Sequence, residues 1–265
     1  MPTTYSLYTF LAPCLQPLYQ FVADYLGQQL HIRLDLVVGQ TYDDIALADF
    51  CFVCGLPYIL RTPPYHRPLL QVLAAPVLPG SRYQDKPIYF SDVIVHRDHP
   101  AASFADLRGG SWAFNEPESQ SGYGITRYHL VTRGETNGFF GQVIQAGFHQ
   151  EAIRRVAARE VDATAIDSHV LAIELRDHPE LAHHIKIIDT LGPSTIQPFT
   201  AAPHIPMTLQ ADVQRVLAEM HLDPEAKSRL EQYLVERFAR VEDADYNDIR
   251  RMLTACEQAQ FLTLR

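Results

Sequence analysis

A serine- and glycine-rich turn at residues 114–124 has the clearest chemical potential in this chain. Its sequence, FNEPESQSGYG, lies between a short predicted strand at 111–115 and a helix expected over 122–132. The first amide groups of a helix lack partners within the helix, and the helix dipole adds partial positive charge there. With the hydroxyl groups of Ser119 and Ser121, this junction predicts a binding site for a phosphate-like anion. The alternative interpretation is that one of these serines only caps the helix.

Composition indicates an ordinary globular protein and excludes several classes of partner. The chain has 265 residues, of which 47% are hydrophobic and 20% are charged, and its formal net charge is −9. An acidic protein of this kind is not expected to bind nucleic acid or an anionic membrane surface. No apolar run approaches the length of a membrane-spanning helix, so we expect no membrane insertion.

The sequence allows two cellular compartments for this protein. The first ten residues, MPTTYSLYTF, do not contain a basic segment followed by a long apolar core, so they do not predict a signal peptide. We therefore expect a cytoplasmic protein if the chain is complete as given. If a signal was trimmed, we expect a periplasmic or other extracytoplasmic protein.

The sequence contains no motif that predicts a metal, a cofactor or a catalytic centre. Cys51 and Cys54 form a C-x-x-C, but the apolar run at 50–55 predicts a buried strand there, which favours two buried small side chains over a zinc site or a redox pair. The G-x-S-x-G, H-E-x-x-H and P-loop patterns are all missing. We therefore expect neither a cofactor nor a metal, and the protein is not expected to be an enzyme.

Apolar periodicity predicts two successive α/β units followed by a helical segment. Strands are expected at 5–10, 32–38, 48–54, 69–77, 88–95, 111–115, 161–166 and 185–188. Helices are expected between Pro13 and Gly27, at 122–132 and 138–146, from Gly147 onward, after Asp167, and at 209–220, 224–238 and 246–259. Strands that alternate with helices predict an α/β fold with a largely parallel sheet.

Seven segments, in order along the chain, resemble landmarks of the phosphate/phosphite/phosphonate ABC-transporter substrate-binding proteins. They are FVCGLPY at 52–58, YFSDV at 89–93, DLRG at 106–109, EPESQSGY at 116–123, EVDATAIDS at 160–168, TLGPS at 190–194 and DADY at 243–246. The resemblance in order and spacing extends from Tyr5 to about Arg251.

This resemblance implies a two-lobed type II periplasmic-binding-protein-like fold. The first lobe would contain residues 1–87 and 200–265, and the second lobe would contain residues 88–199. Two strand segments, near 88–95 and 196–202, would form the hinge, and the ligand would lie between the lobes.

The resemblance also implies roles for individual residues in the second lobe. Ser119 and Ser121, with the amides of Gln120 and Gly122, would donate hydrogen bonds to phosphoryl oxygens. His149 would open a helix and donate into the same site. Gln120 departs from the family pattern, in which a small hydroxyl residue is common at this position.

Three further residues complete the implied site. Asp167, at a strand end, would accept a hydrogen bond from a protonated ligand oxygen. Tyr58 would reach across from the first lobe, and Tyr89 or Phe90 would pack on the substituent of the ligand. Each assignment has a plainer alternative, because His149 and Asp167 would also serve as helix caps and Tyr58 as ordinary core.

The implied function is capture of a small phosphorus oxyanion, namely a phosphonate, phosphite or phosphate, for transport or sensing. We expect a monomer whose partner is an ABC transporter permease or a sensor protein. The alternative is a cytoplasmic enzyme on the same fold, similar to the menaquinone-pathway proteins of the futalosine route. In that case His149 or Asp167 would act as the base.

Overall fold

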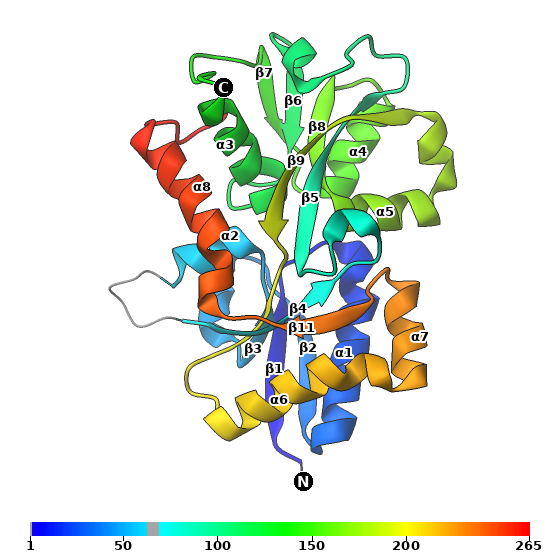
Figure 1. Cartoon of the computed structure of the whole chain (residues 1–265), viewed down its shortest axis with the longest axis vertical. Coiled ribbons are helices and arrows are strands. Elements are labelled where there is room, and N and C mark those ends of the chain that lie inside the picture. The colour runs from blue at the N-terminus through cyan, green and yellow to red at the C-terminus, as the bar shows by residue number, and fades with distance from the viewer. Residues whose placement is uncertain (1, 63–68) are drawn as a thin grey trace. The chain divides into compact units, whose positions relative to one another are not determined.

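The computed structural model describes residues 2–62 and 69–265, which form two compact units (Figure 1). The first unit contains Met1–Ile88 and Thr195–Asn247, and the second contains Tyr89–Ser194 and Asp248–Arg265. The chain therefore passes between the units at 88/89, at 194/195 and again at 247/248. Residues 248–265, which sequence analysis assigned to the first lobe, group with the second unit.

The first unit is built on a six-stranded sheet with the order β11-β4-β10-β3-β1-β2. The strands are β1 Thr4–Thr9, β2 Arg33–Val38, β3 Phe50–Phe52, β4 Gln71–Val77, β10 Phe199–Ala201 and β11 Arg237–Arg240. The helices of this unit are α1 Gln16–Leu30, α2 Gly55–Leu60, α6 Met207–Glu219 and α7 Pro224–Gln232. β1 runs parallel to β2 and β3, whereas β10 and β11 are antiparallel to their neighbours, so this sheet is mixed.

The core of the first unit follows from its apolar patterns. Leu18, Val22 and Leu26 are four residues apart, so they lie on one face of α1, and all three are buried. The β3 strand is buried along its whole length, and the rings of Phe52 and Phe199 meet edge to face with centroids 5.0 Å apart. A strand buried on both faces explains the continuous apolar run at this position in the sequence.

The second unit is built on a five-stranded sheet with the order β7-β6-β8-β5-β9. Its strands are β5 Ile88–His96, β6 Ser111–Phe114, β7 Gln142–Gln145, β8 Ala163–Asp167 and β9 Ile185–Thr195. Its helices are α3 Ile125–Thr132, α4 His149–Ala157, α5 Ser168–Asp177 and most of α8, Asn247–Gln258. β6 is parallel to β7 and β8, and β5 is antiparallel to β8.

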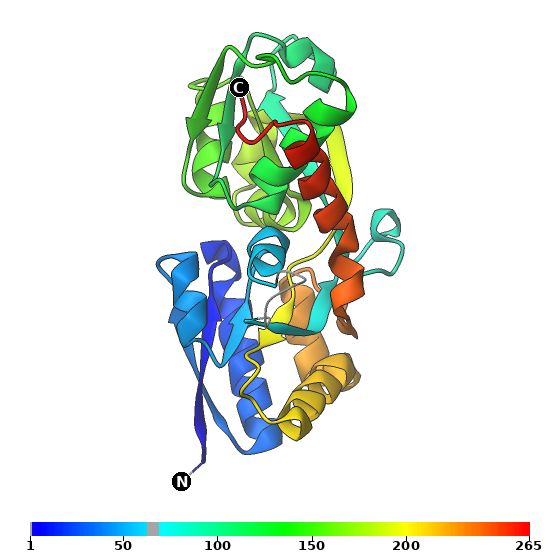
Figure 2. The ribbon, with the colours of Figure 1, turned by 90° about the vertical axis from the view of Figure 1, so that its left-hand side faces the viewer.

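The C-terminal segment is part of the core of the second unit. Phe261 and Leu264 are buried in the same apolar cluster as Trp112. The Leu264 amide donates to the Tyr123 hydroxyl at 3.3 Å, and the Arg127 guanidinium donates to the Leu262 carbonyl at 2.9 Å. Figure 2 shows this segment, in red, beside the green helix α3. The residues after α8 therefore brace the helix that follows the serine-rich turn.

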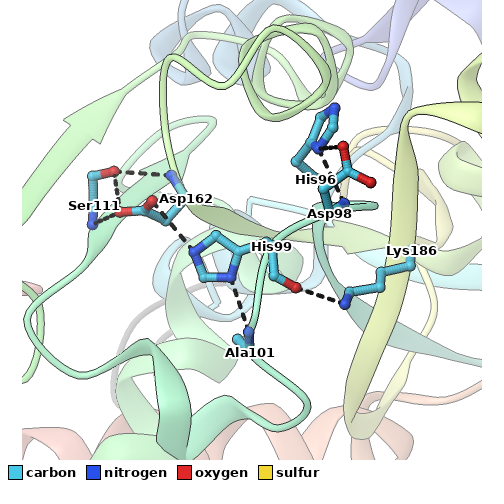
Figure 3. A network of polar contacts seen from close by, with 7 residues as sticks. All are labelled: His96, Asp98, His99, Ala101, Ser111, Asp162 and Lys186. Atoms are coloured by element: carbon cyan, nitrogen blue, oxygen red, sulfur yellow. Dashed lines mark hydrogen bonds and ion pairs between the residues drawn. The ribbon is translucent and has the colours of Figure 1, made fainter.

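A polar network fixes the end of the second sheet at which β6 and β8 begin (Figure 3). The Asp162 carboxylate accepts from the Ser111 amide at 2.7 Å and from the Ser111 hydroxyl at 2.8 Å, and it lies 3.4 Å from His99 Nε2. His99 Nδ1 accepts from the Ala101 amide, and Lys186 Nζ donates to the His99 carbonyl. The network joins the segments that lead into β6, β8 and β9, so its role in the sheet is structural.

The structure corrects three of the predicted elements and adds one helix. Two short strands, β7 and β11, replace parts of the helices predicted at 138–146 and 224–238. The segment at 55–60 forms α2, and β9 continues through Gly192 and Pro193 to Thr195. β7 and β11 are four residues each, and they exist because they pair with β6 and β4. Pairing with a distant strand overrides local propensity. Four residues are also too few for an alternating apolar pattern to be recognised in the sequence.

The two cysteines of the C-x-x-C lie in the first unit. Cys51 and Cys54 are both buried, and burial raises the pKa of the Cys51 thiol. Cys54 lies at the N-terminus of α2 and not within a strand. Among the helices of residues 2–62 and 69–265, none combines the length and the apolar character that a membrane-spanning segment needs.

Candidate anion-binding site

One edge of the second sheet collects the predicted site residues of that unit. Because β6, β7 and β8 are mutually parallel, the segments that follow them leave the sheet at the same edge. These segments carry the serine-rich turn, His149 and Asp167. β5 begins at this edge as well, since Ser91 pairs with Asp167. The carboxyl ends of parallel strands are where α/β sheets bind ligands.

The serine-rich turn enters α3 through a π-helical turn at Gln120–Gly124. The Ser119 side chain caps this turn, because its Oγ accepts from the Gly122 amide at 3.1 Å. The Ser119 carbonyl accepts from the Gly124 amide at 2.8 Å. The capping alternative is therefore observed for Ser119. The Gly122 amide, predicted to donate to the ligand, already donates to Ser119.

Ser121 has a different environment from Ser119. Its Oγ lies 2.9 Å from His149 Nε2 and 3.4 Å from the Ser119 Oγ, and all three side chains are buried. His149 is the first residue of α4, whose N-cap residue is Phe148, so His149 is not a helix cap. The structure thus joins the predicted turn to the predicted histidine by a direct contact between side chains.

His149 is neutral at physiological pH. Burial lowers the pKa of His149 to about 4, although the nearby Asp167 carboxylate acts in the opposite direction. Its Nδ1 is buried and has no hydrogen-bond partner among the residues that the structure describes. A neutral imidazole has one donor and one acceptor nitrogen, so the proton positions on Ser121 and His149 are linked.

Asp167 lies at the end of β8 and caps α5. Its Oδ1 accepts from the His169 amide at 2.8 Å and from the Val170 amide at 3.4 Å, and the residue is 2% exposed. The capping alternative is therefore observed for Asp167 as well. Its charge partly offsets the lowering of the His149 pKa by burial. A role for Asp167 in ligand binding stays a prediction.

The side chain of Gln120 points into the second unit. Its Nε2 donates to the Ser194 hydroxyl and to the Met252 sulfur, each at 3.2 Å. Neither Ser194 nor Met252 is predicted from the sequence to be a neighbour of the turn. Ser194 does lie in one of the segments that carry the family resemblance, whereas nothing in the local sequence indicates Met252.

Gly122 is required by a close approach within the turn. A Cβ atom at this position would lie 2.1 Å from the Asn115 side-chain oxygen. That oxygen is buried, and it has no hydrogen-bond partner in the described part of the chain. Any larger residue at position 122 would therefore displace the Asn115 side chain, so this turn needs glycine at position 122.

The two predicted tyrosines lie in different units. Tyr89 is the first residue of the second unit and is buried in β5, and the neighbouring Phe90 amide donates to Ser168 Oγ at 3.1 Å. Tyr58 lies in α2 of the first unit, where its hydroxyl donates to Asp243 Oδ1 at 2.6 Å. Its ring meets that of Tyr246 edge to face, with centroids 5.0 Å apart. The contacts of both tyrosines with a ligand stay predictions.

A cavity of about 240 Å³ lies in the second unit beside the network of Figure 3. It is lined by His96, Asp98, His99, Pro100, Arg159, Val161 and Asp162. In the described residues, no group of three or more His, Cys, Asp or Glu side chains is placed to hold a metal ion. The cavity contains none of the residues predicted from the sequence.

Comparisons with known proteins identify the family and the fold of this chain. The sequence model of one protein family, described as "ABC transporter, phosphonate, periplasmic substrate-binding protein", matches residues 12–246. A binding protein component of an ABC phosphonate transporter from Pseudomonas aeruginosa is 14% identical, with a TM-score of 0.83 over 98% of this chain and 88% of that chain. PhnD1 from Prochlorococcus marinus, solved in complex with methylphosphonate, is 16% identical, with a TM-score of 0.82 over 98% of this chain and 99% of that chain.

A protein from Xanthomonas citri bound to ATP is 15% identical, with a TM-score of 0.72 over 97% of this chain and 98% of that chain. The likeness to these structures confirms the two-lobed periplasmic-binding-protein fold. The alternative of a cytoplasmic enzyme is not supported, because the matching family consists of transporter binding proteins. The chain belongs to the family of periplasmic substrate-binding proteins of phosphonate ABC transporters.

Proposed function

We propose that the turn at 119–122, with His149 and Asp167, binds the phosphoryl oxygens of a small phosphonate, phosphite or phosphate. The observation that carries this proposal is the 2.9 Å contact between Ser121 Oγ and His149 Nε2 at the sheet edge. Both side chains are buried, so a hydroxyl donor is already held in place before a ligand arrives. Donors that need no reorganisation favour binding because less conformational entropy is lost.

The charge of the assigned residues favours an anion that carries a proton. His149 is neutral, and none of the other second-unit residues assigned to the site is cationic. Attraction for the anion would then come from the helix N-terminus and from hydroxyl donors, opposed by the Asp167 carboxylate. An oxyanion that keeps one proton can place it toward Asp167, whereas a fully deprotonated anion cannot.

Membership of the family supports a proposal for the partner and the mode of capture. We expect the protein to act as a monomer, to enclose its ligand between its two lobes by a hinge motion, and to deliver it to an ABC permease. Tyr58, held by Asp243, is the residue of the first unit that we expect to contact the ligand.

Small-angle scattering and titration calorimetry with methylphosphonate, phosphite and phosphate test the proposal. We expect compaction and a saturable heat signal with at least one of the three, because hinge closure around a ligand reduces the radius of gyration. Unchanged scattering and flat calorimetry with all three ligands would rule out this proposed function.

A substitution at Asp167 tests the expected selectivity. Asp167→Asn replaces an acceptor by a group that can also donate, so sulfate should bind about tenfold more tightly relative to phosphite than it does in the wild type. The cap on α5 should survive, since Asn and Asp cap helices about equally well. Competition calorimetry with sulfate and phosphite measures the ratio.

Asp223→Asn is a matched control for this change. Asp223 caps α7 in the first unit, where its Oδ1 accepts from the Glu225 and Ala226 amides at 2.9 and 3.2 Å. This variant removes a capping carboxylate without changing the second unit, so the sulfate-to-phosphite ratio should stay at the wild-type value. If the wild type already binds sulfate as tightly as phosphite, Asp167 does not face the ligand and is only a cap.

A further inference from the structure

Gln120 lies within the proposed anion-binding turn, but its side chain contacts two distant segments of the second unit. The residue is 1% exposed. Its Nε2 donates to Ser194 Oγ and to Met252 Sδ at 3.2 Å each, and these two acceptors are themselves 3.9 Å apart. A primary amide has two N–H groups, so both have an acceptor within the protein. A shorter hydroxyl side chain at this position would not reach both acceptors.

The two acceptors lie next to the points at which the chain changes units. Ser194 is the last residue of the second unit before the chain continues into the first at Thr195. Met252 lies on α8, a continuous helix whose first residue, Asn247, is the last residue of the first unit. Each acceptor is therefore joined by a short, regular stretch of backbone to one of these two crossing points, 194/195 and 247/248, which we call linkers.

The same two linkers are also joined on the other side of the boundary. Within the first unit, the Thr195 hydroxyl donates to the Asp245 carbonyl at 2.8 Å. The Tyr246 hydroxyl donates to the Ile196 carbonyl at 3.0 Å. The two linkers are thus tied to each other in both units, and in the second unit Gln120 is part of the tie.

We propose that Gln120 is a positioning residue that couples occupancy of the anion-binding turn to the two linkers at 194/195 and 247/248. The inference rests on the proposed function, because it requires a ligand at Ser119 and Ser121. A ligand held by Ser119 and Ser121 also restrains the backbone of Gln120 between them, and the amide transmits this restraint to Ser194 and Met252. Hydrogen bonds to a thioether sulfur are weak, so this contact can rearrange at low cost. A ligand changes the balance of open and closed forms only through such differential contacts.

Gln120→Met tests the coupling, since it keeps the length and approximate volume of the side chain but removes both donors. We expect about fivefold weaker binding of whichever of methylphosphonate, phosphite and phosphate the wild type binds best. We also expect less compaction in small-angle scattering at saturating ligand, with a melting temperature close to that of the wild type. A purely structural role would lower the melting temperature and leave the compaction at saturation unchanged.

Three further variants complete the experiment. The pair Ser194→Ala and Met252→Leu removes the acceptors, and it should reproduce the effect of Gln120→Met on both readouts. Adding Gln120→Met to that pair should produce little further change, because residues that act through one contact are not additive. Gln150→Met is the matched control, since Gln150 donates to Glu174 at 3.0 Å elsewhere in the second unit.

The outcomes separate this inference from the proposed function. Additive effects, or full compaction in Gln120→Met at saturation, would overturn the role of Gln120 while the wild type still binds its ligand. If the wild type binds none of the three oxyanions, both the proposed function and the inference are overturned. Non-additivity together with reduced compaction supports the coupling.

Discussion

Replacing Ser121 by alanine should lower ligand affinity about tenfold to a hundredfold without a comparable loss of stability. A hydrogen bond to a charged acceptor contributes about 1.5–3 kcal/mol, and each 1.4 kcal/mol corresponds to about a factor of ten in affinity. Ser121 Oγ contacts His149 and does not cap the turn, because the capping bond from the Gly122 amide goes to Ser119. Titration calorimetry and thermal unfolding of the same preparation measure the two quantities.

Ser119→Ala is the matched control in the same turn. Loss of a capping hydroxyl costs about 1 kcal/mol of stability, so the melting temperature of this variant should fall. The two serines therefore separate the two interpretations of this turn, since one change should act mainly on binding and the other also on folding. Should Ser121→Ala lower the melting temperature and keep the affinity, the contact between Ser121 and His149 is structural.

The stability of the protein should fall steeply below about pH 6.5 because of His149. Burial lowers its pKa from the ordinary value of 6.5 to about 4 in the folded protein. Between these two values the unfolded chain binds a proton that the folded chain does not bind. The free energy of unfolding therefore decreases as the pH falls through this window, by about 3 kcal/mol from this group alone. Above the window the contribution of His149 does not depend on pH.

Denaturant unfolding of the wild type and of His149→Gln at several pH values isolates this effect. Glutamine does not titrate, and its side-chain amide can replace Nε2 in the contact with Ser121. Carboxylates that do not interact with residue 149 contribute equally to the acid sensitivity of both proteins, so the difference between the two curves reports His149 and its interaction with Asp167. Parallel curves between pH 4 and 6.5 would show that the imidazole is not buried in its neutral form.

Much of the element order could be predicted from the sequence, because it depends on local patterns. The alternation of apolar residues in β1, β2 and β5 and the apolar face of α1 are visible within a few neighbouring positions. β7 and β11 could not be predicted, since each is four residues long and is stabilised by pairing with a distant strand. The same limit applies to residues 248–265, whose placement in the second unit depends on burial of Phe261 and Leu264 in that core.

For the site, the sequence by itself determined the turn and the chemical types of its donors. Ser119, Ser121 and Gly122 form a contiguous pattern at a strand–helix junction, and its chemistry follows from local geometry. Only the tertiary structure decided which serine caps and which contacts His149, since that contact joins residues 28 positions apart. It also decided the direction of Gln120, whose partners are 74 and 132 positions away. The physical reason is that caps and periodicities depend on neighbouring backbone, whereas side-chain contacts depend on how distant strands and helices pack.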